Sequence, residues 1–185
     1  MEAWRSNCKE LGLVSMSKTV KQIPATWVTR DNFLPFGQAI FPVADDKPFD
    51  REDAQLCIDR GTPRFYIMRV EKRGCRFQKI TRHSQCTQCL GSLEGKDWYI
   101  AVAPPSDKDY PEIEKMAAFR IPGNCFIKLG LGTWHAGPLF EHEAVNFYNL
   151  ELSDTNIRDR FTYDFFSQDS LEFQIVSPPE VAVHT

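Results

Sequence analysis

The sequence lacks any apolar run that approaches the roughly 18 residues of a membrane-spanning helix, so we expect no membrane segment. It also lacks an excess of basic residues, because 22 Lys and Arg stand against 25 Asp and Glu, for a formal net charge of −3. Without a positive field to hold a phosphate backbone, we expect no nucleic-acid partner. Residues 1–16 carry charges and no continuous apolar core, which argues against a secretory signal and favours a cytoplasmic location.

Several chemical motifs are also missing. The sequence has no phosphate-binding loop, dinucleotide fingerprint, HExxH zinc motif or serine nucleophile elbow, so nucleotide hydrolysis, hydride transfer and zincin-type proteolysis have no support. One CxxC motif is present, from Cys86 to Cys89, but no helix is expected after it and no second pair accompanies it. The six cysteines are therefore expected to be reduced thiols without a redox or zinc role.

What is present suits one well-filled domain. The chain has 185 residues, 42% of them hydrophobic, with 14 Phe, 5 Tyr and 4 Trp. Apolar character begins at Ile23 and ends before the prolines that follow Ser177, with no linker or repeat between. We therefore expect a flexible leader over residues 1–22, a single domain over 23–177 and a short tail over 178–185.

Short strands dominate the expected secondary structure. Stretches rich in β-branched and aromatic residues, or alternating in polarity, cover residues 64–70, 77–83, 98–103, 117–121, 125–129, 145–152 and 173–176. Helices are expected only over Arg51–Arg60 and as single turns near 111–116 and 167–171. A parallel α/β sheet would need long helices between its strands, and these are missing. The pattern predicts an all-β, jelly-roll-like barrel with a few short helices.

Two of the four histidines stand out as candidates for chemistry. His83 ends an expected strand, and His135 follows Trp134 in a turn rich in Gly and Pro, where a rigid and partly apolar surrounding tunes an imidazole pKa. The same place would also suit a histidine that only satisfies a loop carbonyl. His142 lies between two glutamates and His184 lies in the tail, so both are expected on the surface.

Charged residues also interrupt the apolar strands. Arg69 and Lys128 each share a strand face with aromatic residues, and Phe147, Asn149 and Glu151 share a face of another strand. A charged residue in such a pattern either marks an edge strand or lies inside a barrel. If several of them converge, they would line a polar pocket for a small anion.

The segments around the two histidines resemble the signatures of the ureidoglycolate lyase family, formerly called ureidoglycolate hydrolase, in the cupin superfamily. Arg82-His83, Thr87-Gln88 and the strand end Val102-Ala103-Pro104 resemble the first signature. Ala118-Phe119, Pro122-Gly123, Gly132-Thr133-Trp134-His135 and Pro138-Leu139-Phe140 resemble the second, and Phe36-Gly37 resembles an early Tyr/Phe-Gly element. The resemblance covers about Trp27 to Ser153, which is most of the domain.

The resemblance implies a cupin barrel, usually a homodimer, that cleaves ureidoglycolate to glyoxylate and urea in purine (allantoin) catabolism. It carries over His83, Gln88 and His135 as candidate functional residues, with Arg69 on the strand that matches an Arg-containing strand of the family. Among the catalytic roles that this reaction needs, we expect His135 to be the general acid/base and His83 to be its partner or a metal ligand.

The small carboxylate substrate needs further contacts. We expect Arg69 to clamp its carboxylate, because a guanidinium pairs bidentately with that group. Gln88 is expected to orient the ureido group, with Lys128 and Trp134 as additional substrate-binding residues.

Two positions depart from the family pattern and keep other functions open. Ala136 stands where the family often has a second histidine, and Gln85 stands where metal-binding cupins carry a second imidazole. An amide is a weaker ligand than an imidazole for a first-row metal, so a divalent metal at His83 has weak support. The alternatives are a divergent isomerase, cyclase or lyase that acts on another small polar metabolite, and a cupin that binds a small carboxylate without catalysis.

Overall fold

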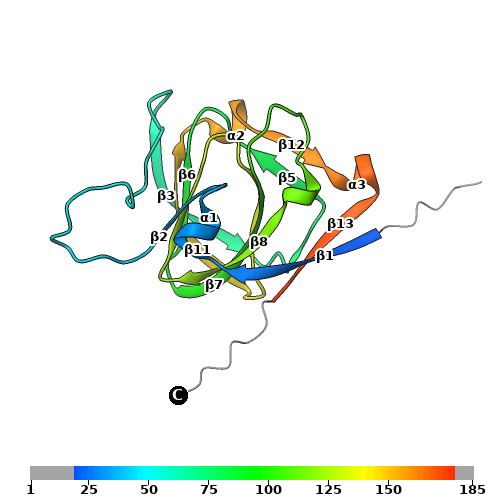
Figure 1. The fold of residues 1–185 in the computed structure, drawn as a ribbon, viewed down its shortest axis with the longest axis horizontal. Coiled ribbons are helices and arrows are strands. Elements are labelled where there is room, and N and C mark those ends of the chain that lie inside the picture. The colour runs from blue at the N-terminus through cyan, green and yellow to red at the C-terminus, as the bar shows by residue number, and fades with distance from the viewer. Residues whose placement is uncertain (1–18, 178–185) are drawn as a thin grey trace, which may run out of the picture.

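The structure, a computed structural model that describes residues 19–177, consists almost entirely of β-strands (Figure 1). The strands are β1 (Thr19–Trp27), β2 (Gly37–Ile40), β3 (Pro63–Glu71), β4 (Arg76–Phe77), β5 (Lys79–Arg82), β6 (Gln88–Ser92), β7 (Gly95–Ala103), β8 (Ala117–Gly123), β9 (Phe126–Leu129), β10 (Trp134–Leu139), β11 (Ala144–Leu152), β12 (Phe161–Asp164) and β13 (Leu171–Val176). Short helical turns connect some of them: α1 (Arg30–Phe33), η1 (Ile113–Lys115), α2 (Thr155–Arg158) and α3 (Phe165–Asp169).

The strands form two sheets that curl around a common interior. The eight-stranded sheet has the order β12-β5-β10-β7-β8-β1-β13-β4, and the five-stranded sheet has the order β2-β9-β6-β11-β3. Most neighbours are antiparallel, whereas β1 pairs parallel with both β8 and β13. The predicted all-β, cupin-like barrel with a few short helices is confirmed as a two-sheet half-barrel.

Two apolar clusters hold the sheets in place. Between the sheets, Trp98 on β7 meets Phe147 on β11 edge to face, with ring centroids 5.2 Å apart, and both side chains are fully buried. A second cluster lies around α3 and β13, where Phe165 and Phe173 pack at 4.7 Å. Burying a Phe side chain contributes about 1.5–3 kcal/mol, so these clusters make a rigid frame for the polar residues between them.

The structure corrects two expectations about the chain. Residues 51–60 form turns and irregular backbone, not a helix, because the Gln38 side chain from β2 donates to the carbonyls of Arg51 and Asp53 and accepts from the amide of Gln55. Residues 19–22 pair with β13, so the last four residues of the expected leader belong to strand β1. The remainder of that leader, 1–18, and the tail over 178–185 lie outside the described residues.

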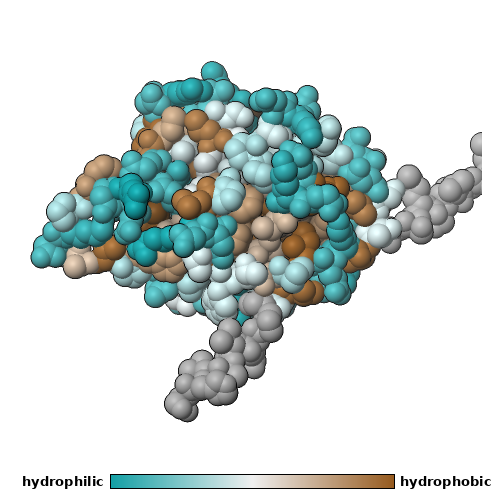
Figure 2. All heavy atoms as spheres, viewed as in Figure 1, coloured by the Kyte–Doolittle hydropathy of each residue, from teal (hydrophilic) through white to brown (hydrophobic). Residues whose placement is uncertain are grey.

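The outer face of the five-stranded sheet carries a row of aromatic side chains. Tyr148 stacks on Phe65 at 5.6 Å and on Phe126 at 5.9 Å, and Phe65 is 67% exposed beside the exposed Ile67. Figure 2 shows one side of the molecule, where apolar patches interrupt a largely polar surface. No helix within the described part of the chain is long and apolar enough to span a membrane. The homodimer and the cytoplasmic location stay predictions.

Candidate active site

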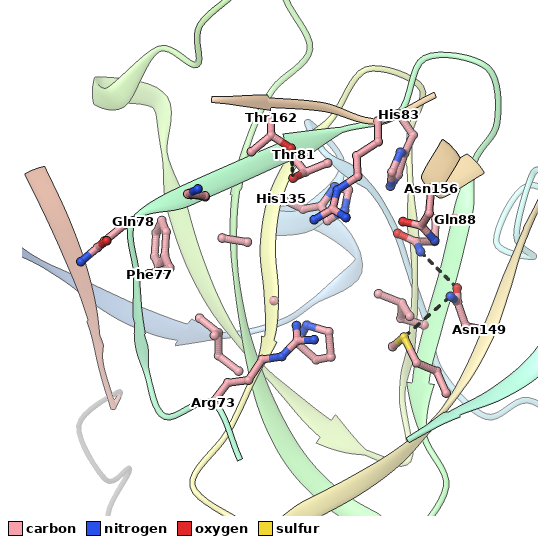
Figure 3. A pocket seen from close by; sticks show the side chains of 18 of the residues that line it. Arg73, Phe77, Gln78, Thr81, His83, Gln88, His135, Asn149, Asn156 and Thr162 are labelled. Carbon is pink, nitrogen blue, oxygen red and sulfur yellow. Dashed lines mark hydrogen bonds between the residues drawn. The ribbon is translucent and has the colours of Figure 1, made fainter. Parts of the chain in front are cut away.

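A cavity of about 570 Å³ takes in residues of both sheets (Figure 3). Its walls come mainly from β5 and β10 on one side and from β6 and β11 on the other. His83, His135, Gln88 and Asn149 lie toward one end, and Arg73 and Phe77 lie toward the other. Polar side chains converge here within an otherwise apolar frame, as expected of a ligand-binding site.

Strand pairing brings the two candidate histidines together. His135, on β10, lies opposite Thr81 of β5, and His83 directly follows β5. The imidazole centroids are 5.1 Å apart, and the two residues are only 5% and 8% exposed. Both side chains line the cavity, so the two histidines singled out in the sequence form one site.

Backbone carbonyls engage the same ring nitrogen, Nδ1, in both histidines. Nδ1 of His83 lies 2.5 Å from the carbonyl oxygen of Asp159, and Nδ1 of His135 lies 3.3 Å from that of Thr133. A carbonyl oxygen only accepts, so Nδ1–H donates in each case, and a neutral ring keeps an unprotonated Nε2. Nε2 is therefore the nitrogen of each ring that is left for a ligand.

The surroundings keep His135 neutral. The pKa of His135 is lowered from 6.5 to about 3, mainly by burial and also by the nearby charges of His83 and Arg160, against the opposing effect of the hydrogen bond to the Thr133 carbonyl. Both the desolvation and the cationic neighbours disfavour the imidazolium form. At neutral pH His135 is thus an unprotonated imidazole that can accept a proton.

A cluster of amides faces the histidines. Nε2 of Gln88, on β6, donates to Oδ1 of Asn149 at 3.2 Å and to a carboxylate oxygen of Glu151 at 2.9 Å; both acceptors lie on β11. The other end of the Gln88 amide, Oε1, is buried and has no hydrogen-bond partner within the described residues. Buried polar atoms are rarely left without a partner, so this oxygen points to a ligand that donates to it.

A cationic side chain that no sequence motif marked also lines the cavity. Arg160, between α2 and β12, lines the cavity, and its charge acts on His135. No hydrogen bond or ion pair engages its guanidinium within residues 19–177. It lies in irregular structure, where no periodicity indicates which way a side chain points, so the sequence offered no signal for it.

The prediction that Arg69 clamps the carboxylate is wrong, because Arg69 does not line the cavity. It lies on the outer face of β3, where its side chain is 63% exposed and pairs with Glu71 at 2.9 Å. Alternation correctly put Arg69 on one face with Phe65 and Ile67, but that face is the outward one. Met68, the neighbouring residue of β3, reaches the cavity instead.

Lys128 and Trp134 do not contact the cavity either, which corrects both assignments. Lys128 lies in register with Gln38 and Cys89 within the five-stranded sheet, and burial lowers its pKa. Trp134 is fully buried in the cluster around α3, and the Arg82 guanidinium lies 4.5 Å from its ring centroid. It faces away from its neighbour His135, because side chains alternate along β10.

Of the two CxxC cysteines, Cys86 lines a narrow gap beside His83, Gln88 and His135, whereas Cys89 lies in register with Lys128. Cys86 is buried with its sulfur 3.3 Å from the Thr155 hydroxyl. Burial raises the pKa of the Cys89 thiol to about 11, which leaves very little thiolate at neutral pH. The environment of Cys89 is thus not that of a reactive cysteine.

The donor set does not suit a divalent metal at His83. Within residues 19–177 no group of three or more His, Cys, Asp or Glu side chains could hold an ion. The cavity offers two imidazole nitrogens and the amide oxygen of Gln88, whereas first-row metals are usually held by at least three imidazole, thiolate or carboxylate ligands. Glu151 does not complete the set, because its oxygens accept hydrogen bonds from neighbouring side chains.

The fold and the site together define a cupin-like β-barrel with a two-histidine, amide-lined pocket. A family model described as ureidoglycolate lyase matches residues 20–165, most of the chain. The chain belongs to the ureidoglycolate lyase family, which confirms the resemblance seen in its sequence motifs. No curated protein matches it in a sequence search.

Proposed function

We propose that this protein is a carbon–nitrogen lyase that cleaves ureidoglycolate to glyoxylate and urea. Membership of the ureidoglycolate lyase family supports a lyase reaction. The observation that carries the specific proposal is the pair of buried imidazoles, 5.1 Å apart, beside the unpartnered amide oxygen of Gln88. This arrangement offers proton transfer and recognition of an N–H group in one small cavity.

The reaction needs two proton transfers. One carbon of ureidoglycolate bears a hydroxyl group, a carboxylate and a ureido nitrogen. The hydroxyl loses its proton and becomes the aldehyde of glyoxylate, while the electrons of the breaking C–N bond pass to the nitrogen, which gains a proton and leaves as urea. A positioned acid or base contributes typically about 10² to 10⁴ in rate to each such transfer.

The histidine pair supplies both transfers. Nε2 of the neutral His135 accepts the hydroxyl proton, and His83, acting as an imidazolium with a proton on both ring nitrogens, delivers its Nε2 proton to the departing nitrogen. The negative charge of the bound carboxylate opposes the cationic neighbours that lower the pKa of His135, so its proton affinity rises when substrate binds.

Arg160 takes the place of Arg69 as the carboxylate clamp in this proposal. It lines the cavity and acts on His135, so a carboxylate held by its guanidinium would lie beside the reacting carbon. Charge-assisted, bidentate hydrogen bonds make arginine well suited to this task. Gln88 keeps its predicted role, since its free Oε1 accepts from the ureido group.

The proposal is tested by incubating the purified protein with racemic ureidoglycolate while glyoxylate, urea and ammonia are measured together. Equal amounts of glyoxylate and urea are expected, and pre-treatment with a chelator should leave the rate unchanged. Ammonia in place of urea would mean hydrolysis of the ureido group, and a folded protein that forms no product would overturn the proposal.

The size of the cavity favours one alternative. At about 570 Å³ it is within the range that holds drug-sized ligands, so ureidoglycolate fills only part of it, and Arg73 lines the end away from the histidines. A divergent lyase, isomerase or cyclase for a larger polar metabolite would use this space. A panel of longer hydroxy acids and ureido acids separates the two, and saturable carboxylate binding without product would instead indicate a non-catalytic cupin.

A further inference from the structure

Behind the cavity, β11 carries a carboxylate that is almost completely buried. Glu151 is 1% exposed and forms no ion pair with a Lys, Arg or His side chain among the described residues. Its two oxygens instead accept hydrogen bonds from the Tyr66 hydroxyl at 3.1 Å, from Gln88 Nε2 at 2.9 Å and from Asn156 Nδ2 at 3.2 Å. A buried charge without such partners would be costly, so the three donors account for its place in the fold.

The carboxylate sets the direction of every hydrogen bond around it. An ionised carboxylate only accepts, so Tyr66 must donate its proton to Glu151. The Tyr66 oxygen then accepts from Nδ2 of Asn149 at 2.9 Å, which turns Oδ1 of Asn149 toward Gln88. Both protons of Gln88 Nε2 are thereby engaged, one by Asn149 and one by Glu151.

This network fixes the only orientation open to the Gln88 amide. If the amide flipped, its oxygen would face the Asn149 oxygen and the Glu151 carboxylate, and two hydrogen bonds would become repulsive contacts. Oε1 is consequently held on the ligand side, buried and without a partner within the described residues. The site presents a fixed acceptor where an unanchored amide could offer either a donor or an acceptor.

We propose that Glu151 is a positioning residue that makes this subsite selective for a terminal N–H₂ group. The inference rests on the proposed function for the identity of the substrate, and it explains how a ureido end is distinguished from an acetyl or carboxylate end. A ligand without a donor at this place leaves Oε1 buried and unpaired, and sites of this kind reject such analogues strongly.

Two stable ligands test the selectivity without turnover. N-carbamoylglycine lacks the reacting hydroxyl, and N-acetylglycine differs from it by a methyl group in place of the terminal NH₂. Isothermal titration calorimetry with the full chain should show N-carbamoylglycine binding about tenfold or more tightly, the effect of one buried acceptor left unpaired. Glu151→Gln should reduce that ratio to about twofold or less, because a glutamine can donate to Gln88 and release its orientation.

Matched variants separate positioning from general damage. Glu143→Gln makes the same change on an exposed glutamate just before β11 and should leave the ratio unchanged. Tyr66→Phe removes the relay between Glu151 and Asn149 and should lower the ratio even if Glu151→Gln fails to fold, as monitored by circular dichroism. The same loss in a folded Glu151→Gln protein and in Tyr66→Phe supports the inference.

Three results would overturn the role of Glu151. They are equal binding of the two ligands to the wild type, no binding of N-carbamoylglycine, and an unchanged affinity ratio in the folded Glu151→Gln and Tyr66→Phe variants. These outcomes are distinguishable from failure of the proposed function. Turnover of ureidoglycolate with a ratio near one contradicts the role of Glu151 alone. A tenfold ratio without turnover contradicts the lyase reaction alone.

Discussion

Over part of its area, the five-stranded sheet has polar residues on its inward face and apolar residues on its outward face. This is the reverse of an ordinary half-buried sheet. The inward face carries the buried Asn149 and Glu151, whereas the outward face exposes Phe65 and Ile67, with the half-buried Tyr148 stacked on Phe65. Antiparallel sheets usually turn apolar residues to the core and polar residues to water. The inversion separates residues kept for chemistry, inside, from residues available for contact with another surface, outside.

The largest effect should come from the histidines on the inward side. His135→Ala and His83→Ala are each expected to lower kcat by about 10² to 10⁴, since each removes one proton-transfer group. His142→Ala, which changes an exposed histidine, should leave kcat unchanged. Steady-state kinetics on the three proteins check this, and a kcat within twofold of the wild type in both site variants would contradict the assignment.

Substitutions of the two candidate arginines compare the cavity, which Arg160 lines, with the outward face of β3, which carries Arg69. Arg160→Ala should raise KM by about 10- to 100-fold, because the carboxylate loses a charge-assisted contact. Arg69→Ala should change KM by less than twofold, since an exposed ion pair contributes little. KM values from initial rates decide between them. The opposite pattern would restore Arg69 as the clamp.

The buried imidazole should also make stability depend on pH. The pKa of His135 is lowered from 6.5 to about 3, so the unfolded chain binds a proton that the folded chain does not. The contribution of the neutral His135 to the free energy of unfolding is fully present above about pH 6.5, and it is lost as the pH decreases toward 3. Between pH 6.5 and 5 the free energy of unfolding should decrease by about 2 kcal/mol. Urea denaturation at the two pH values should show this decrease in the wild type, and its persistence in His135→Asn would assign it to other groups.

The outward face is expected to have the smallest effect on the reaction. We propose that the predicted homodimer forms through the aromatic row around Phe65 and Ile67, where β3 also ends the sheet. Replacing Phe65 and Ile67 by Glu should shift the protein from dimer to monomer in sedimentation velocity, with kcat within about threefold. A dimer that persists in this variant would place the interface elsewhere, and a wild-type monomer would contradict the dimer.

Strand patterning predicted much of the fold but not which face of each strand points inward. Residues 64–70 and 145–152 were recognised as strands because local alternation decides them. Alternation shows which residues share a face, and it therefore grouped Arg69 correctly while leaving its direction open. Residues 51–60 were mistaken for a helix because the contact that shapes them comes from Gln38, far away in the chain.

The site was predictable to the extent that local context marked it. The turn rich in Gly and Pro marked His135, the end of an expected strand marked His83, and the family motifs indicated Gln88. Glu151 was seen to share a face with Asn149, yet its donors come from β3, β6 and α2, so no local pattern could indicate its role. Arg160, in irregular structure, gave no signal.

The lyase reaction and the role of His135 are tested together by the stoichiometry of urea and glyoxylate released from ureidoglycolate by the wild-type protein and by His135→Ala. We expect one urea for each glyoxylate in the wild type and a rate at least about a hundredfold lower in the folded variant. Equal rates in the two proteins, or glyoxylate accompanied by ammonia in place of urea, would contradict it.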